Sequence, residues 1–280
     1  MDQTTWKHVT IDYPGTTPEQ REHRAVAHLT SALPAAETDR LITAWFYVRK
    51  GPWRIRYLLA QPSNSDPVHP LLTDGTTWTS DIYEPETHAF GGPGGMNAAH
   101  ALFHGDSRNL LTYLRNAPTD RPERSLVLFT ALMRAAGLEP NEQGDVWAKV
   151  AEQRPALPTP APTTEAWTSY SNGIRQLLLG QARTELVGAD WLSTYEATGH
   201  TLRALRHHGE LTRGIRAIIA LHVLFAWNRL GLPTTTQALL ARAAMQATFG
   251  DEPCLPDTNA QITTASQHGT GLHHSSSPRT

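Results

Sequence analysis

Four cations lie among aromatic and β-branched residues in WFYVRKGPWRIRY, residues 45–57: Arg49, Lys50, Arg54 and Arg56. The Gly-Pro step in this segment favours a chain reversal, so the pattern predicts two antiparallel strands. Because side chains alternate across a strand, Arg54 and Arg56 should point to the same face. Two neighbouring guanidiniums can bind a carboxylate or a phosphate bidentately. The alternative interpretation is a solvated strand surface with ordinary arginines.

Two acidic residues follow in a loop that we expect close to the strand pair. They are Glu84 and Glu86 of YEPETHAFGGPGG, in which two prolines and four glycines exclude a regular helix. We expect them to form ion pairs with Arg54 and Arg56. The alternative is that they act as a general acid and base.

A histidine lies in the most apolar stretch of the chain, residues 213–230. This stretch predicts a central helix buried on all sides. His222 could act as an acid or a base if it faces a cleft, because its ordinary pKa is near neutral. A core histidine with one hydrogen bond is the alternative. Arg229 lies seven residues later on the same stripe. With Asn228 it either stabilises the following turn or contacts a substrate.

Metal and cofactor signatures are weak in this sequence. His100 and His104 have a spacing that can hold zinc, but HAAHALFH lacks the glutamate of a zinc-protease helix and a third ligand. Asp106 and Ser107 suggest a helix kink or an ion pair with the strand arginines. The sequence contains no Walker loop, no nucleophile elbow and no dinucleotide fingerprint. We therefore expect neither a metal nor a cofactor.

Composition narrows the function classes. The chain has 280 residues, a formal net charge of -2 and a single cysteine, Cys254. This charge argues against a duplex nucleic-acid binder, and one cysteine fits a reducing cytoplasm without disulfides. Met1–Thr10 is polar, so we expect no signal peptide. The longest apolar stretch is too short to cross a bilayer.

The pattern of elements predicts an α+β fold. An N-terminal antiparallel sheet with flanking helices should occupy residues 1–154, and a mostly helical part should occupy residues 165–250. Residues 155–164, with the sequence PALPTPAPTT, are typical of a linker. We expect residues 61–81 to form a loop with a short edge strand, and helices near 18–33, 96–114 and 211–230. Residues 1–250 are expected to be one domain, and residues 251–280 a disordered tail.

Four segments together resemble a known family: WFYVRKGPWRIRY, YEPETHAFGGPGGMNAAHALFHGDS, RSLVLFTALMRAAGLEPNEQGDVW and RGIRAIIALHVLFAWNRLGLP. They are similar to the thiopeptide-type bacteriocin biosynthesis domain. This domain is the glutamate-elimination part of class I lantibiotic dehydratases and also occurs as a stand-alone protein. The resemblance covers roughly residues 6–250. It implies an enzyme that modifies a ribosomally made precursor peptide without a metal or cofactor.

The resemblance also implies a reaction and partners. A dehydratase subunit would transfer glutamate from glutamyl-tRNA to Ser or Thr, and this chain would eliminate the glutamate to leave dehydroalanine or dehydrobutyrine. Arg54 and Arg56 match the family's Arg-x-Arg strand, which binds the departing glutamate. His222 lies in the helix of the family's catalytic histidine. The expected partners are thus the precursor peptide and the glutamylating subunit, with no direct nucleic-acid contact.

Two departures from the family pattern keep other functions open. The chain has Ala89-Phe90-Gly91-Gly92 where many members have Arg-Tyr-Gly-Gly, and its histidine lies further from Asn228. The alternatives are a [4+2] cyclisation of two dehydroalanines with release of the leader peptide, or a non-catalytic subunit. The candidate catalytic residues are His222, Arg54 and Arg56. The candidate substrate-binding residues are Arg49, Lys50, Glu84, Glu86 and Arg229.

Overall fold

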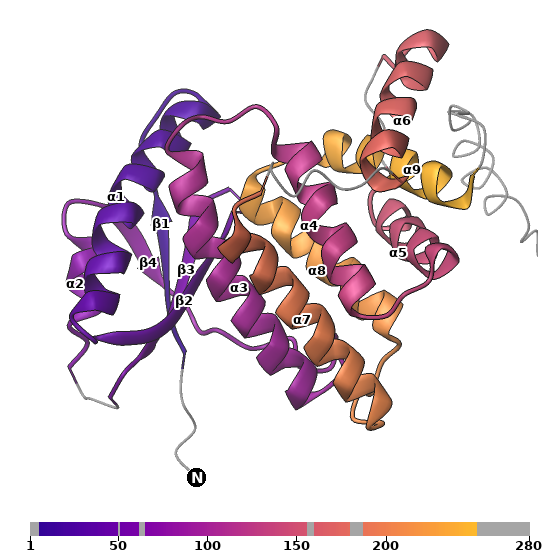
Figure 1. Cartoon of the computed structure of the whole chain (residues 1–280). Helices are drawn as coiled ribbons and strands as arrows, with labels where there is room; N and C mark the ends of the chain where they lie inside the picture. Colours follow the sequence, from indigo (N-terminus) through magenta and orange to yellow (C-terminus); the bar gives the residue numbers. More distant parts are fainter. Residues whose placement is uncertain (1–5, 50, 62–64, 156–159, 180–186, 251–280) are drawn as a thin grey trace, which may run out of the picture.

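A computed structural model describes residues 6–49, 51–61, 65–155, 160–179 and 187–250. Lys50, residues 156–159 of the expected linker and the expected C-terminal tail lie outside these residues. The described chain has an antiparallel sheet with helices at its N-terminal end and is mostly helical thereafter (Figure 1). The α+β fold class expected from the sequence is confirmed.

The sheet contains four antiparallel strands in the order β2-β3-β1-β4. Their bounds are β1 (Lys7–Asp12), β2 (Ile42–Arg49), β3 (Trp53–Leu59) and β4 (Thr77–Ser80). β2 and β3 form the expected strand pair around the Gly-Pro step. Trp53, Ile55 and Tyr57 are buried on one face of β3, whereas Arg54 and Arg56 alternate with them and are only half-buried. The alternation predicted from the sequence is thus present.

Helix α1 (Pro18–Thr38) packs against β2, and helix α2 (Val68–Thr73) packs against α1 and β1. Tyr13 joins the two layers, since its ring contacts Trp53 and its hydroxyl lies 2.8 Å from His28 Nδ1 in α1. α1 continues through Pro34 beyond the end expected near residue 33. The expected loop at residues 61–81 contains α2 before the edge strand β4, because Asp66 Oδ1 accepts the N–H groups of Val68 and His69 at its first turn.

Helix α3 (Pro93–Leu114) runs along the outer edge of β2 (Figure 1). Its His104 Nδ1 lies 3.2 Å from the main-chain nitrogen of Trp45, and its Ser107 Oγ accepts the N–H of Tyr47 at 3.4 Å. An edge strand has main-chain groups that need partners. His104 and Ser107 therefore complete one edge of the sheet.

The remaining helices are α4 (Arg121–Ala135), α5 (Pro140–Glu152), α6 (Thr164–Leu179), α7 (Ala189–His207), α8 (Ile215–Leu230) and α9 (Thr234–Phe249). α8 packs against α5, α3, α4 and β2, and most of its residues are buried. The central buried helix expected from the sequence is confirmed, although it begins at Ile215 rather than near residue 211. None of the helices described is both long and apolar enough to cross a membrane.

Candidate functional site

The sheet carries a cluster of polar and aromatic side chains on the face opposite α1 and α2. The register places His8 of β1 and Phe46 of β2 directly beside Arg56 of β3. Thr10 and Val48 lie beside Arg54 in the same way. We call this surface the arginine face; its members are His8, Phe46, Arg54, Arg56 and, from the segments that follow β4, Tyr83 and His100.

Arg56 is held by aromatic rings and not by a carboxylate. Its guanidinium carbon lies 4.3 Å from the ring centroid of Tyr83 and 5.4 Å from that of Phe46. Its Nε is buried and has no hydrogen-bond partner among the described residues. Burial, together with the positive charge of Arg54, lowers the pKa of Arg56. A cation that is partly removed from water and has no counter-ion creates a positive potential around it, and this potential attracts an anion.

The two acidic residues expected to neutralise the arginines are exposed and do not do so. Among the described residues, no carboxylate lies within ion-pairing distance of Arg54 or Arg56. Glu86 is near enough to raise the pKa of Arg56, but this effect is weaker than that of burial. The ion pairs expected for Glu84 and Glu86 are therefore not formed in this structure.

Two histidines on the arginine face are neutral at pH 7. Burial, and then the charge of Arg56, lowers the pKa of His8 to about 4 and the pKa of His100 to about 4. His100 Nε2 lies 2.9 Å from the Tyr83 hydroxyl oxygen. From the sequence, His100 is expected only as a possible zinc ligand, and no role is expected for His8 or Tyr83. The alternation of β1 could have placed His8, but no local signal places Tyr83.

His222 lies in the core behind the arginine face. Its ring is fully buried and packs edge-on against Phe90 at 5.0 Å and Phe103 at 6.0 Å between centroids. Neither ring nitrogen has a partner among the described residues. Burial lowers the pKa of His222 to about 3, and the charge of Arg229 adds to this effect. Phe103 in turn contacts Phe46, so two aromatic rings separate His222 from Arg56.

Arg229 is fully buried and bound to Asp106. Its Nε donates to Asp106 Oδ2 at 2.7 Å, and Asp106 Oδ1 accepts from Trp191 Nε1 at 2.8 Å and from the Tyr195 hydroxyl at 2.9 Å. This network joins α8 to α3 and α7. Asp106 thus pairs with Arg229 and not with the strand arginines. The guanidinium of Arg229 is enclosed, and its carbon lies 4.7 Å from the ring centroid of Phe103. A contact between Arg229 and a substrate remains a prediction.

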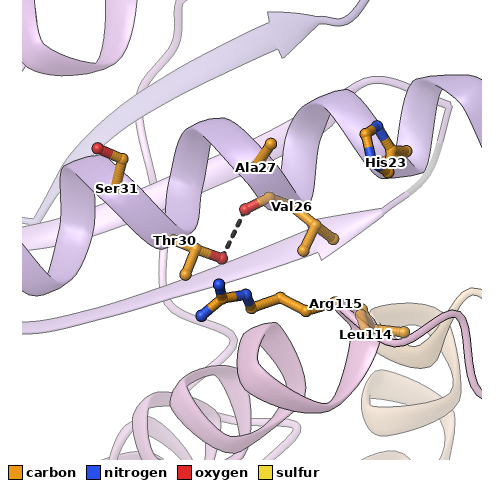
Figure 2. Close-up of a pocket in the computed structure, with 7 residues that line it drawn as sticks. All are labelled: His23, Val26, Ala27, Thr30, Ser31, Leu114 and Arg115. Atoms are coloured by element: carbon orange, nitrogen blue, oxygen red, sulfur yellow. Dashed lines mark hydrogen bonds between the residues drawn. The ribbon is translucent and has the colours of Figure 1, made fainter.

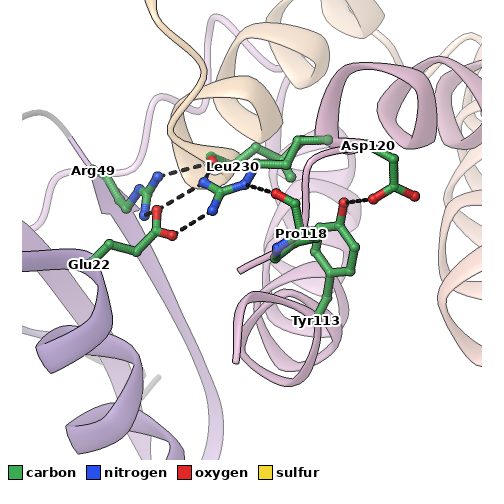
Figure 3. A network of polar contacts seen from close by, with 7 residues as sticks. Glu22, Arg49, Tyr113, Pro118, Asp120 and Leu230 are labelled. Carbon is green, nitrogen blue, oxygen red and sulfur yellow. Dashed lines mark hydrogen bonds and ion pairs between the residues drawn. The ribbon is translucent and has the colours of Figure 1, made fainter. Parts of the chain in front are cut away.

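Arg49 belongs to a separate cluster on the other face of the strand pair. It forms an ion pair with Glu22, which also binds Arg121, and both arginines donate to the carbonyl oxygen of Leu230 (Figure 3). These contacts hold the C-terminal end of α8 against β2, α1 and α4. The structure therefore separates Arg49 from Arg54 and Arg56, and Lys50 lies outside the described residues.

Two cavities lie away from the arginine face. One, of about 440 Å³, lies between α1 and the end of α3, with the Arg115 side chain below Val26 and Thr30 (Figure 2). The other, of about 810 Å³, is lined by Arg49, Glu22 and neighbouring residues. Among the described residues, no group of side chains is arranged to hold a metal ion.

The chain matches the family described as lantibiotic biosynthesis dehydratase C-term over residues 6–248. It belongs to this family. The resemblance found in the sequence is thereby confirmed. No curated protein matches the chain in sequence.

Solved structures share this fold at low sequence identity. The tRNA-dependent lantibiotic dehydratase MibB from Microbispora sp. 107891 is 16% identical with a TM-score of 0.59, over 89% of this chain and 29% of MibB. The pyridine synthase TbtD of thiomuracin biosynthesis is 15% identical with a TM-score of 0.56, over 88% of this chain and 98% of TbtD. TsrL is 18% identical with a TM-score of 0.53, over 89% of this chain and 99% of TsrL. The chain thus spans less than a third of the dehydratase and nearly all of the other two proteins.

Proposed function

We propose that this protein eliminates glutamate from glutamylated Ser or Thr residues of a precursor peptide. The observation that supports this most is the unneutralised pair Arg54 and Arg56. A glutamyl group brings carboxylate charge to the site, and more develops as the bond to the Ser or Thr side chain breaks. Guanidiniums already positioned and partly desolvated bind such charge more strongly than they would in water.

The reaction also needs a group that takes the α-proton of the modified residue. A neutral imidazole can accept this proton. His222 is our assignment from the family resemblance, whereas His100 lies nearer to Arg56 in the structure. His222 can take part only if the rings of Phe90 and Phe103 move apart, and this difference makes the two histidines separable by experiment.

The proposed reaction indicates which partners this protein needs. Elimination needs a substrate that another protein has glutamylated, so we propose a glutamylating dehydratase subunit and a precursor peptide as cytoplasmic partners.

A second function is favoured by one specific observation, the end-to-end match to TbtD and TsrL. It is the [4+2] cyclisation of two dehydroalanines. Cyclisation must bring two distant residues together and overcome the entropy of closing a peptide loop. It does not by itself require a carboxylate site, and the unneutralised arginines therefore favour elimination.

Mass spectrometry distinguishes the two reactions. Wild-type protein incubated with a glutamylated precursor should release free glutamate, and the peptide mass should fall by one glutamic acid per site. Arg54→Ala and Arg56→Ala should remain folded and lower this rate by about a hundredfold, as expected when one strong contact to developing charge is lost. Arg206→Ala, which removes an exposed arginine of α7, is the matched control and should be unaffected.

Two outcomes would contradict the proposal. Normal rates of glutamate release in both arginine variants would remove the carboxylate-binding role. Release of a leader peptide with a pyridine chromophore from a pre-dehydrated precursor would show cyclisation instead. His222→Phe and His100→Phe, measured in the same assay, identify which imidazole moves the proton.

A further inference from the structure

The two outer edges of the sheet are treated differently by the fold. At the β2 edge, His104 and Ser107 of α3 contact the main chain of Trp45 and Tyr47. At the β4 edge, no described residue bonds to the outward main-chain groups. β4 is exposed at all four of its residues, Thr77–Ser80. It contains none of the lysines or prolines with which natural proteins often block an edge strand.

The register shows which groups of β4 are free. Asp81 N–H donates to the carbonyl oxygen of His8 in β1, and Thr79 lies opposite Thr10. In an antiparallel pair every second residue bonds to its neighbour strand. The N–H and C=O groups of Trp78 and Ser80 therefore point away from β1. They form a short row of two donors and two acceptors.

Exposed apolar side chains lie in β4 and in the segments next to it in the chain. In the part of the chain that the structure describes, four large hydrophobic side chains are exposed, and three of them are in α2, β4 or the residue after Asp81: Leu71, Trp78 and Ile82. Trp78 is 42% exposed and Ile82 is 83% exposed. Such residues give a second strand apolar contacts in addition to main-chain hydrogen bonds.

We propose that the β4 edge binds an extended segment of the peptide substrate as a fifth strand. This inference rests on the proposed function and adds where the peptide is held. Main-chain pairing suits a peptide enzyme because it depends little on side-chain identity. A second copy of this chain fits less well, because a contact limited to four main-chain groups buries much less than the roughly 1,000 Å² of a stable protein interface.

The β4 edge is close enough to Arg54 and Arg56 for one extended peptide to reach both. A strand added to β4 would be three strand spacings from β3, which is about 14 Å. Four or five extended residues span this distance. The bound segment should therefore lie at least four residues from the Ser or Thr that reaches Arg54 and Arg56. Because exposed Asp74 and Asp81 flank β4, the segment should be neutral or basic.

Ser80→Pro tests the edge because it removes one outward N–H and leaves the bonds to β1 intact; proline is tolerated at such positions of edge strands. Ser80→Ala keeps the N–H and is the matched control. The long probe is a synthetic peptide with six alternating Val and Thr residues, five Gly/Ala residues and one glutamylated serine. The short probe lacks the six alternating residues.

For the long probe, the KM for glutamate release should rise about fivefold to tenfold in Ser80→Pro, as expected for one lost hydrogen bond, and stay unchanged in Ser80→Ala. The short probe should be processed equally by all three proteins. Unchanged KM values for the long probe in Ser80→Pro would overturn the inference. The same is true if the variant only changes the oligomeric state seen by analytical ultracentrifugation.

Two further measurements keep the inference and the proposed function apart. If wild-type protein releases no glutamate from either probe, the proposed function fails, but anisotropy of the fluorescein-labelled long probe still reports binding at the edge. If Ser80→Pro does not fold, wild-type protein is tested with a long probe N-methylated at alternate residues of the six-residue segment. Equal binding of the methylated and unmethylated probes would then refute pairing at β4.

Discussion

Replacing the enclosed histidine of α8 tests the structure behind the arginine face. His222→Leu keeps a similar volume and removes an imidazole whose nitrogens have no partner among the described residues. A buried polar group without a hydrogen bond destabilises the folded state. At neutral pH the variant should therefore be at least as stable as the wild type.

The pH dependence of the unfolding free energy gives the size of this effect. The pKa of His222 is 6.5 in its ordinary surroundings and about 3 in the folded protein, so the unfolded chain binds a proton that the folded protein excludes. Wild-type stability is therefore lost as the pH falls below 6.5. Between about pH 7.5 and pH 5, linkage gives about 2 kcal/mol for one such group. The stability advantage of His222→Leu should grow by this amount.

Equilibrium urea unfolding at several pH values measures this difference. The lowered pKa values of His8 and His100 also make the folded protein less stable in acid. Both histidines are present in both proteins, so their effect cancels in the comparison. Replacement of the exposed His200 by leucine is the control for the loss of an imidazole at the surface. A constant difference for His222→Leu would mean that the imidazole is solvated in the folded protein. The enclosed position described above would then be refuted.

Two other changes test how α8 is held. Asp106→Ala leaves the buried guanidinium of Arg229 without its partner and should cost about 3–5 kcal/mol of unfolding free energy in urea, whereas Asp106→Leu combined with Arg229→Met should cost clearly less; equal costs would contradict the buried ion pair. Gly231→Ala should lower the melting temperature more than Gly209→Ala, because both glycines have a φ of 72° but only at Gly231 would a Cβ overlap the guanidinium of Arg49. Equal shifts in calorimetry would show that the cluster around Arg49 does not restrict this turn.

The placement of the arginine pair follows from the sequence alone. Alternation along a strand is a local property of the backbone, so Arg54 and Arg56 could be assigned to one face before any partner strand was known. The burial of α8 could also be predicted, because a helix that is apolar all round has no face for water. The family could also be identified from the sequence, because the segments that resemble it are continuous in the chain.

The partners of these residues were decided by the tertiary structure. Asp106 and Arg229 are 123 residues apart, and only the packing of α3 against α8 brings them together. Glu22, rather than Glu84 or Glu86, neutralises an arginine of the strand pair, and that arginine is Arg49. Local patterns set the direction of a side chain, but its counter-ion depends on which distant element packs beside it.

The same limit applies to the histidines. The sequence places His222 on a buried helix, but Phe90 and Phe103 from other segments close the space around it. His8 and His100 come next to Arg56 only when β1, β3 and α3 assemble. Helix and strand periodicities are fixed by neighbouring residues, whereas the charge, burial and access of a site arise from contacts that span the whole chain.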